Sequence, residues 1–280
     1  MICEKCQKEK SKKLRNGIIA AVIVAVIAAA IPLSFMAVRN YNYKEAVSLL
    51  KAEKFEQAGK IFEKLDDYKD SKKKKNICDM GIQYNEAIAL MKEEKYGEAR
   101  ALFEELTDSA YEYKDSRKQE EFCGNKLAYA DAQALLDASE YYEAYNAFQE
   151  IPDFEDSAEK AQSCIQPMPS TGELYRNEAY AGMDCPIEIS RTSATEKLPI
   201  ILRIRTTDDT AVADIFMAAG EGYNISLPAG SYKITLIMGV DQWFGIEDMF
   251  GDLSFEREMN SGKDNGAYVL QTNYTYTLSL

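Results

Sequence analysis

The apolar positions of this 280-residue chain follow three different patterns. Residues 17–38 form an apolar run without a single charge, and residues 40–165 carry apolar side chains at helical spacing. From residue 185 onward, apolar and polar positions alternate. Spacings of three and four are typical of amphipathic helices, and strict alternation is typical of half-buried strands. The pattern therefore predicts a multidomain α plus β protein.

The apolar run from Gly17 to Val38 is predicted to be a transmembrane helix. Its 22 residues would reach roughly 33 Å, enough for a hydrocarbon core of about 30 Å. The run is longer than the apolar region of a cleaved signal peptide, and no small-residue cleavage site follows it. Because six Lys/Arg precede it, residues 1–16 are predicted to be cytoplasmic and residues 40–280 extracytoplasmic.

One sequence unit recurs three times within residues 40–165. The equivalent positions are Ala46, Ala87 and Ala132; Ala58, Ala99 and Ala144; Phe62, Phe103 and Phe148; and Cys78, Cys123 and Cys164. Each unit predicts two amphipathic helices, whose alanines allow close approach. The spacing resembles that of tetratricopeptide repeats, which implies an α-solenoid of helical hairpins. The period of 41–45 residues is longer than the usual value of about 34.

A pentapeptide marks the end of each unit: DYKDS at 67–71, EYKDS at 112–116 and DFEDS at 153–157. Asp and Ser are preferred helix N-caps, so the pentapeptide is interpreted as a structural joint rather than a binding motif. The cysteine that follows each joint is interpreted as a small apolar residue packed between repeats. A disulfide between Cys164 and Cys185 is left open.

Residues 166–184, which contain two prolines, are predicted to be a linker, with a short helix as one alternative for its second half. Residues 185–280 are predicted to form an antiparallel β-sandwich. Its expected strands are 186–190, 199–206, 211–217, 223–227, 231–239, 253–259, 267–271 and 274–280.

The loop from Gly239 to Gly251, here called the aromatic loop, contains the only tryptophan of the chain. The candidate binding residues are Trp243, Phe244 and Phe250, together with Tyr232 in the preceding strand. Two interpretations stay open: an exposed aromatic platform for a glycan or peptide, or a plug that closes one end of the sandwich. The segment LPAGSYKI before the loop resembles a turn of small bacterial surface β-sandwiches.

Composition narrows the range of functions. The chain has no histidine, which removes the commonest general base and metal ligand. No phosphate-binding loop, nucleophile elbow or calcium loop is present. We therefore expect no enzymatic activity and no cofactor. The net charge is −13, with +5 in residues 1–39 and −18 in residues 40–280. Such an acidic bulk makes nucleic acid an unsuitable partner.

Cys3 and Cys6 form a CxxC pair in the basic N-terminal tip. A structural zinc site needs four ligands, so zinc at this pair would have to be shared between two chains. A reduced pair and acylated cysteines are the alternatives.

The order of tip, span, repeats and sandwich resembles that of single-pass envelope proteins of Gram-positive bacteria, which often begin with a zinc ribbon. The resemblance implies an extracytoplasmic scaffold that binds a protein or a cell-envelope polymer. The alternative is a transmembrane sensor with a ligand-binding ectodomain and a metal- or redox-responsive CxxC tip. The oligomeric state is left open.

Overall fold

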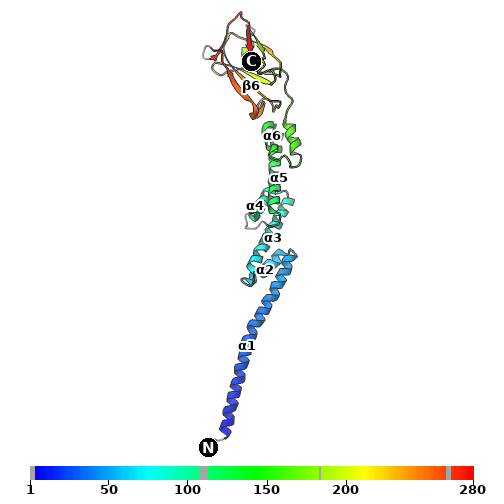
Figure 1. The fold of residues 1–280 in the computed structure, drawn as a ribbon, viewed down its shortest axis with the longest axis vertical. Coiled ribbons are helices and arrows are strands. Elements are labelled where there is room, and N and C mark those ends of the chain that lie inside the picture. The colour runs from blue at the N-terminus through cyan, green and yellow to red at the C-terminus, as the bar shows by residue number, and fades with distance from the viewer. Residues whose placement is uncertain (1–3, 108–112, 183, 263–265) are drawn as a thin grey trace. The chain divides into compact units, whose positions relative to one another are not determined.

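The computed structural model describes residues 4–107, 113–182, 184–262 and 266–280 (Figure 1). The protein is mixed α and β: helices form its N-terminal part, and two β-sheets form its C-terminal part. The chain divides into two compact units, Met1–Lys126 and Leu127–Leu280. The second unit contains both the third repeat and the β-sheets.

Long and short helices alternate along the repeats. The helices are α1 (Glu4–Lys51), α2 (Phe55–Leu65), α3 (Ser71–Lys92), α4 (Tyr96–Thr107), α5 (Ser116–Asp137), α6 (Tyr141–Gln149) and α7 (Ser157–Cys164). Helices α3 and α5 have 22 residues each and begin at the serine of a pentapeptide. The polar run after each of these joints therefore continues, without a break, into the first helix of the next repeat.

The predicted transmembrane helix is contradicted by the structure. Residues 17–38 do not form a helix of their own, because they are the middle of α1, which has 48 residues and charged residues towards both ends. Among the residues whose placement is described, no helix meets the length and apolarity needed to cross a membrane. The predictions of a single-pass membrane protein, a cytoplasmic tip at 1–16 and an extracytoplasmic part at 40–280 are therefore wrong.

The positions that recur in the sequence are the ones that the repeats bury. All twelve of the recurring Ala, Phe and Cys side chains named above are fully enclosed. They lie in three separate clusters, one for each repeat. This confirms the packing role predicted for the cysteines: Cys78, Cys123 and Cys164 are buried free thiols, as is Cys185, so there is no disulfide between Cys164 and Cys185.

The C-terminal part contains nine described strands. They are β1 (Gly172–Arg176), β2 (Cys185–Ser190), β3 (Ile200–Thr206), β4 (Ala211–Met217), β5 (Tyr223–Leu227), β6 (Gly230–Met238), β7 (Phe255–Met259), β8 (Tyr268–Leu270) and β9 (Tyr276–Ser279). One sheet has the order β1-β4-β3-β6-β7, with β8 also paired to β6, and the other has the order β5-β2-β9. Pairing is antiparallel except between β2 and β9. All eight expected strands are present.

The segment predicted as a linker, 166–184, contains a strand that the sequence did not indicate. Strand β1 pairs antiparallel with β4, and the short 3-10 helix η1 (Glu178–Tyr180) follows it. Only five residues long and irregularly paired, β1 has too little alternation to be recognised. The sheet therefore begins at Gly172 rather than at residue 185.

The six-stranded sheet is apolar on both faces. On one face, Ile200, Leu202 and Ile204 of β3 belong to a core shared with the three-stranded sheet. On the opposite face, Ile201 belongs to a second cluster, which Trp243 and Phe250 of the aromatic loop complete. Alternating side chains of one strand thus enter two different cores, as the period of two requires. The second core is the reason that the aromatic loop lies against the sheet.

Two glycines in helices provide a test of repeat packing. A Cβ on Gly81 of α3 would lie 2.7 Å from the ring of Phe55, whereas a Cβ on Gly97 of α4 would meet nothing within 4 Å. We expect Gly81→Ala to lower the free energy of unfolding by about 1–3 kcal/mol through overpacking. Gly97→Ala is the control and should be neutral or stabilising by up to about 1 kcal/mol. Urea unfolding followed by circular dichroism measures both, and equal effects would contradict the packing.

Candidate functional site

The pentapeptides are joints in which a tyrosine binds an aspartate. The hydroxyl of Tyr43 donates a hydrogen bond to the carboxylate of Asp70. The same pair recurs as Tyr84 with Asp115 and as Tyr129 with Asp156, each at 2.5 Å. The tyrosine comes from the first helix of the repeat, and the aspartate comes from the joint that ends it.

The aspartate of each joint was predicted to cap the following helix with its side chain, and this prediction was wrong for Asp70 and Asp156. Asp70 and Asp156 occupy the N-cap position, but neither side chain makes a cap hydrogen bond to its helix. Their carboxylates are instead bound by tyrosine. The buried Ser71 donates from its hydroxyl to the backbone oxygen of Tyr68 at 2.5 Å, and Lys69 between them has a positive φ of 56°. The pentapeptide thus has a structural role, as expected, with a different hydrogen bond at its centre.

The tyrosine–aspartate bond changes the acidity of both partners. The hydroxyl of Tyr84 holds the pKa of Asp115 below its usual value. Burial, followed by the hydrogen bond to Asp115, raises the pKa of Tyr84 to about 12. The folded state is therefore stabilised at pH values above the ordinary aspartate pKa, and this contribution is lost as the pH falls through the lowered value.

We expect Tyr84→Phe to lower the free energy of unfolding by about 1 kcal/mol at neutral pH, because one hydrogen bond is lost. The difference from wild type should shrink as the pH falls through the aspartate titration. Tyr96→Phe is the matched control, since Tyr96 lies in the same unit and contacts its neighbours through its ring. Urea unfolding at several pH values measures the effect, and a pH-independent difference would contradict it.

The structure buries all four candidate binding residues and brings Trp243 and Phe250 into contact, but it places Tyr232 in a different core. Trp243, Phe244, Phe250 and Tyr232 are each at most 4% exposed. Tyr232 lies in the core between the two sheets, and its hydroxyl donates to the backbone oxygen of Pro228 at 2.9 Å. Their burial argues against the exposed platform, but Trp243 and Phe250 pack on the sheet face opposite the shared core and do not close one end of a sandwich. Ligand binding by these residues stays a prediction.

The aromatic loop packs in two directions. Trp243 makes edge contacts with Phe216 of the sheet and with Phe250 in the loop, at ring-centroid distances of 5.7 and 5.3 Å. Phe244, the next residue, contacts Tyr142 and Tyr145 of α6 at 5.0 and 5.2 Å. The loop therefore joins the sheet to the third repeat within the second unit.

Hydrogen bonds strengthen this junction. The backbone N–H of Gln166 donates to the oxygen of Trp243 at 2.7 Å. The backbone N–H of Asp252 donates to the hydroxyl of Tyr142 at 3.0 Å. Between these points, Gly251 has a positive φ of 61°, and a Cβ at this position would lie 2.2 Å from the ring of Tyr142. Only glycine leaves room for this contact.

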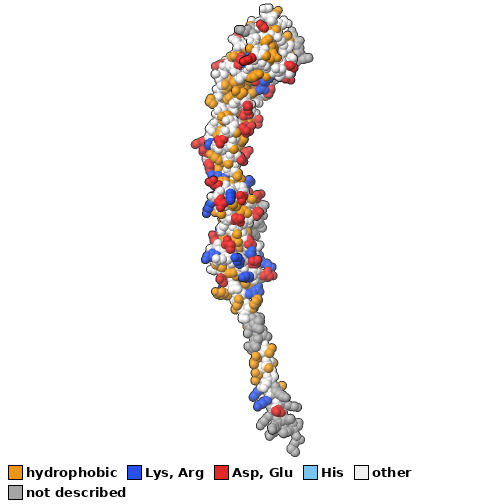
Figure 2. All heavy atoms as spheres, turned by 180° about the vertical axis from the view of Figure 1, so that it is seen from behind, with side chains coloured by type: hydrophobic (Ala, Val, Ile, Leu, Met, Phe, Trp, Pro, Cys, Tyr) orange, Lys and Arg blue, Asp and Glu red, His pale blue; other side chains and the backbone are white. Residues whose placement is uncertain are grey.

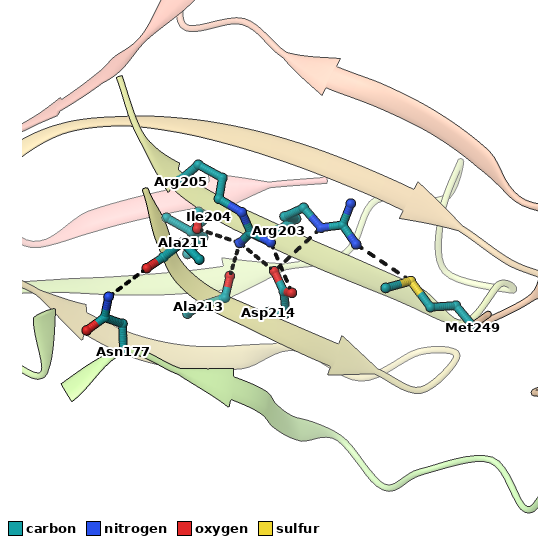
Figure 3. Close-up of polar contacts among 8 residues, drawn as sticks. All are labelled: Asn177, Arg203, Ile204, Arg205, Ala211, Ala213, Asp214 and Met249. Atoms are coloured by element: carbon teal, nitrogen blue, oxygen red, sulfur yellow. Dashed lines mark hydrogen bonds and ion pairs between the residues drawn. The ribbon is translucent and has the colours of Figure 1, made fainter. Parts of the chain in front are cut away.

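Polar side chains continue the sheet face on which Trp243 packs, and one of them, Arg203, contacts Met249 of the aromatic loop (Figure 3). Arg205 binds Asp214 with two hydrogen bonds, of 2.7 and 3.2 Å. The Nε of Arg203 lies 3.6 Å from the same carboxylate, and its Nη2 lies 3.8 Å from the sulfur of Met249. The two arginines are thus part of the sheet surface on which the loop rests.

Beside the aromatic loop lies an acidic cleft of about 630 Å³. Its lining includes Glu140 and Glu143 from the third repeat, Glu247 and Asp248 from the loop, and the exposed side chain of Ile246. Sequence reasoning did not identify this cleft. The one feature of the sequence that could have indicated the cleft is the scarcity of basic residues nearby, since Lys160 is the one Lys or Arg in residues 127–165.

The carboxylates of the cleft affect one another. Burial, followed by the charges of Glu143, Glu247 and Glu140, raises the pKa of Asp248 above its usual value, and a backbone hydrogen bond from Tyr142 opposes the shift. Among the described residues, no group of three or more His, Cys, Asp or Glu is placed to hold a metal ion. The clustered carboxylates give the cleft a negative potential.

The zinc prediction falls largely outside the described part of the chain. Cys3 lies outside the described residues, and Cys6 lies in α1, where only the course of its backbone is described. Zinc at this pair stays a prediction.

No family model matches the chain, and no curated protein sequence matches it. The resemblance to single-pass envelope proteins of Gram-positive bacteria thus has no support from relatives. The absence of a membrane-spanning helix among the described residues contradicts it.

Gly251 provides a test of the junction between loop and repeat. We expect Gly251→Ala to destabilise the second unit by about 1–3 kcal/mol more than Gly262→Ala, because the added methyl group would overlap Tyr142. Gly262 is the matched control: its φ of 76° imposes similar backbone strain, but a Cβ there would meet nothing within 4 Å. Fluorescence of the single tryptophan during urea unfolding measures the difference, and equal losses would refute the contact.

Proposed function

We propose that this chain is a non-catalytic interaction protein, whose helical repeats form a tetratricopeptide-like solenoid and support a C-terminal β-sandwich. Recurring buried Ala, Phe and Cys positions support the first assignment. A core of side chains shared by two sheets supports the second. Helical repeat arrays bind partners through extended surfaces built by stacked units.

We infer that the partner is a protein with a basic segment, and the acidic cleft is the observation that carries this proposal. Residues 127–280 contain nine Lys/Arg and 25 Asp/Glu, a net charge of −16. By contrast, residues 1–126 carry +3, and Figure 2 shows basic and acidic side chains mixed along the helices. Complementary potential speeds encounter and selects partners by charge. The exposed Ile246 supplies an apolar contact beside the carboxylates.

The negative net charge of residues 127–280 also argues against some classes of binding partner. A nucleic acid backbone would be repelled by the second unit. Support for a non-catalytic role comes from the sequence, which lacks histidine and any recognisable catalytic motif. These two points favour a basic protein segment over nucleic acid or a reacting substrate.

Binding of a fluorescent Lys/Arg-rich peptide to the full chain tests the proposal. We expect measurable anisotropy-detected binding at about 0.05 M salt and strong weakening at about 0.5 M, because salt screens the attraction. The double variant Glu143→Gln/Glu247→Gln should weaken binding several-fold. The matched control is Glu188→Gln/Glu221→Gln, which removes two exposed carboxylates of the second unit that do not line the cleft. Equal weakening by both double variants would show diffuse attraction only and would reject the cleft.

A further inference from the structure

Helix α6 has no N-terminal cap of its own. Its N-cap residue, Glu140, makes no side-chain cap hydrogen bond. The first-turn N–H groups of a helix need acceptors, and the positive end of the helix dipole favours a carboxylate there. Asp248 of the aromatic loop lines the cleft at this end of α6, together with Glu140 and Glu143. A carboxylate from about one hundred residues later in the chain therefore lies near the N-terminus of α6.

Three further contacts hold the same segment to α6. Phe244 packs on Tyr142 and Tyr145, and the N–H of Asp252 donates to the Tyr142 hydroxyl. The aromatic pairs are insensitive to pH in the physiological range. Asp248 is different, because it is an ionisable group at the centre of the contact.

The docked position of Asp248 also has an electrostatic cost. Glu140, which precedes α6, Glu143 of α6 and Glu247 of the loop line the same cleft as Asp248. Within the described part of the chain, no lysine or arginine forms an ion pair with Asp248. Ionised carboxylates that share a cleft repel one another, and the partial burial of Asp248 increases the free-energy cost of its ionisation. The helix dipole favours one carboxylate near the N-terminus of α6, whereas four ionised carboxylates in one cleft repel one another.

We propose that the contact between the aromatic loop and α6 is a proton-sensitive latch: acidification tightens the docking of the loop, and a rise in pH loosens it. The latch controls how firmly the third repeat holds the β-sheets. This inference goes beyond the proposed partner binding and does not depend on it, because the latch operates in the chain alone.

The sign follows from the preference of the docked loop for the proton. Docking raises the pKa of Asp248, whereas in a released loop the carboxyl group would titrate near its ordinary value. The docked state therefore binds a proton more tightly than the released state, and docking gains free energy as the pH falls through the titration range. At pH values above that range, the docking of the loop on α6 keeps its weaker, pH-independent free energy. The Tyr142 backbone bond acts in the opposite direction and is outweighed by burial and by the three glutamates.

Hydrogen–deuterium exchange of the full chain tests the latch. Three amides in the loop report its closure: Phe244 N–H bonds to Met249, Met249 N–H to Gly245, and Gly251 N–H to Asp248. After correction for intrinsic exchange, we expect several-fold greater protection of peptides covering 244–251 at about pH 4.5 than at about pH 8. In Asp248→Asn, which removes the ionisable group and keeps a side chain of nearly the same size, this pH dependence should disappear.

Two further variants make the result decisive. Glu188→Gln removes an exposed carboxylate of β2 and should behave like wild type. Glu143→Gln/Glu247→Gln should raise protection at pH 8 and reduce the pH dependence, which keeps the test open if Asp248→Asn fails to fold. The latch is refuted if wild-type protection is independent of pH or falls on acidification, or if Asp248→Asn keeps the wild-type response. None of these readouts involves the basic peptide, so the latch and the proposed function can fail separately.

Discussion

A sheet with apolar side chains on both faces needs other residues packed on each face, and this constraint organises the C-terminal half of the protein. The three-stranded sheet covers one face. The other face carries Ile201, Phe216 and Ile237, whose side chains would be exposed to water without a second layer of residues packed on them. Burial of such side chains contributes roughly 25 cal/mol per Å² of apolar surface. The aromatic loop supplies that layer with Trp243 and Phe250, so a connection between two strands becomes part of the core.

The same arrangement couples the β-sheets to the third repeat. Because Trp243 faces the sheet, its neighbour Phe244 faces away from it and is available to α6. Tyr142 then serves both the aromatic contact and the hydrogen bond to Asp252, and Gly251 lets the backbone approach its ring. The loop was proposed from the sequence as either plug or platform. Trp243 and Phe250 cover the outer face of the sheet, and Phe244 packs on the third repeat.

The helical part uses one joint three times, with a degenerate third copy. In DFEDS, Phe154 replaces tyrosine and Glu155 replaces lysine, yet Tyr129 still bonds Asp156 and edge-packs on Phe154. The hydrogen bond needs only the aspartate, and the ring contact needs only an aromatic side chain. The residue between them, Glu155, has the same positive φ as its counterparts Lys69 and Lys114. These tolerances explain why the second and third positions of the pentapeptide can change without loss of the joint.

The sequence by itself determined the elements and the repeats, because period and spacing are local properties. Constant intervals from Ala to Phe and from Ser to Cys identified buried positions of all three repeats, and alternation located eight of the nine described strands. Only the tertiary structure decided what those elements contact. The pairing of β1 with β4, the tyrosine bound to each aspartate, and the packing of Phe244 on α6 join residues far apart in the chain. Local composition also misled at residues 17–38, whose apolar run is one part of a longer helix. Contacts of this kind depend on which surfaces meet after folding, and no periodicity along the chain records that.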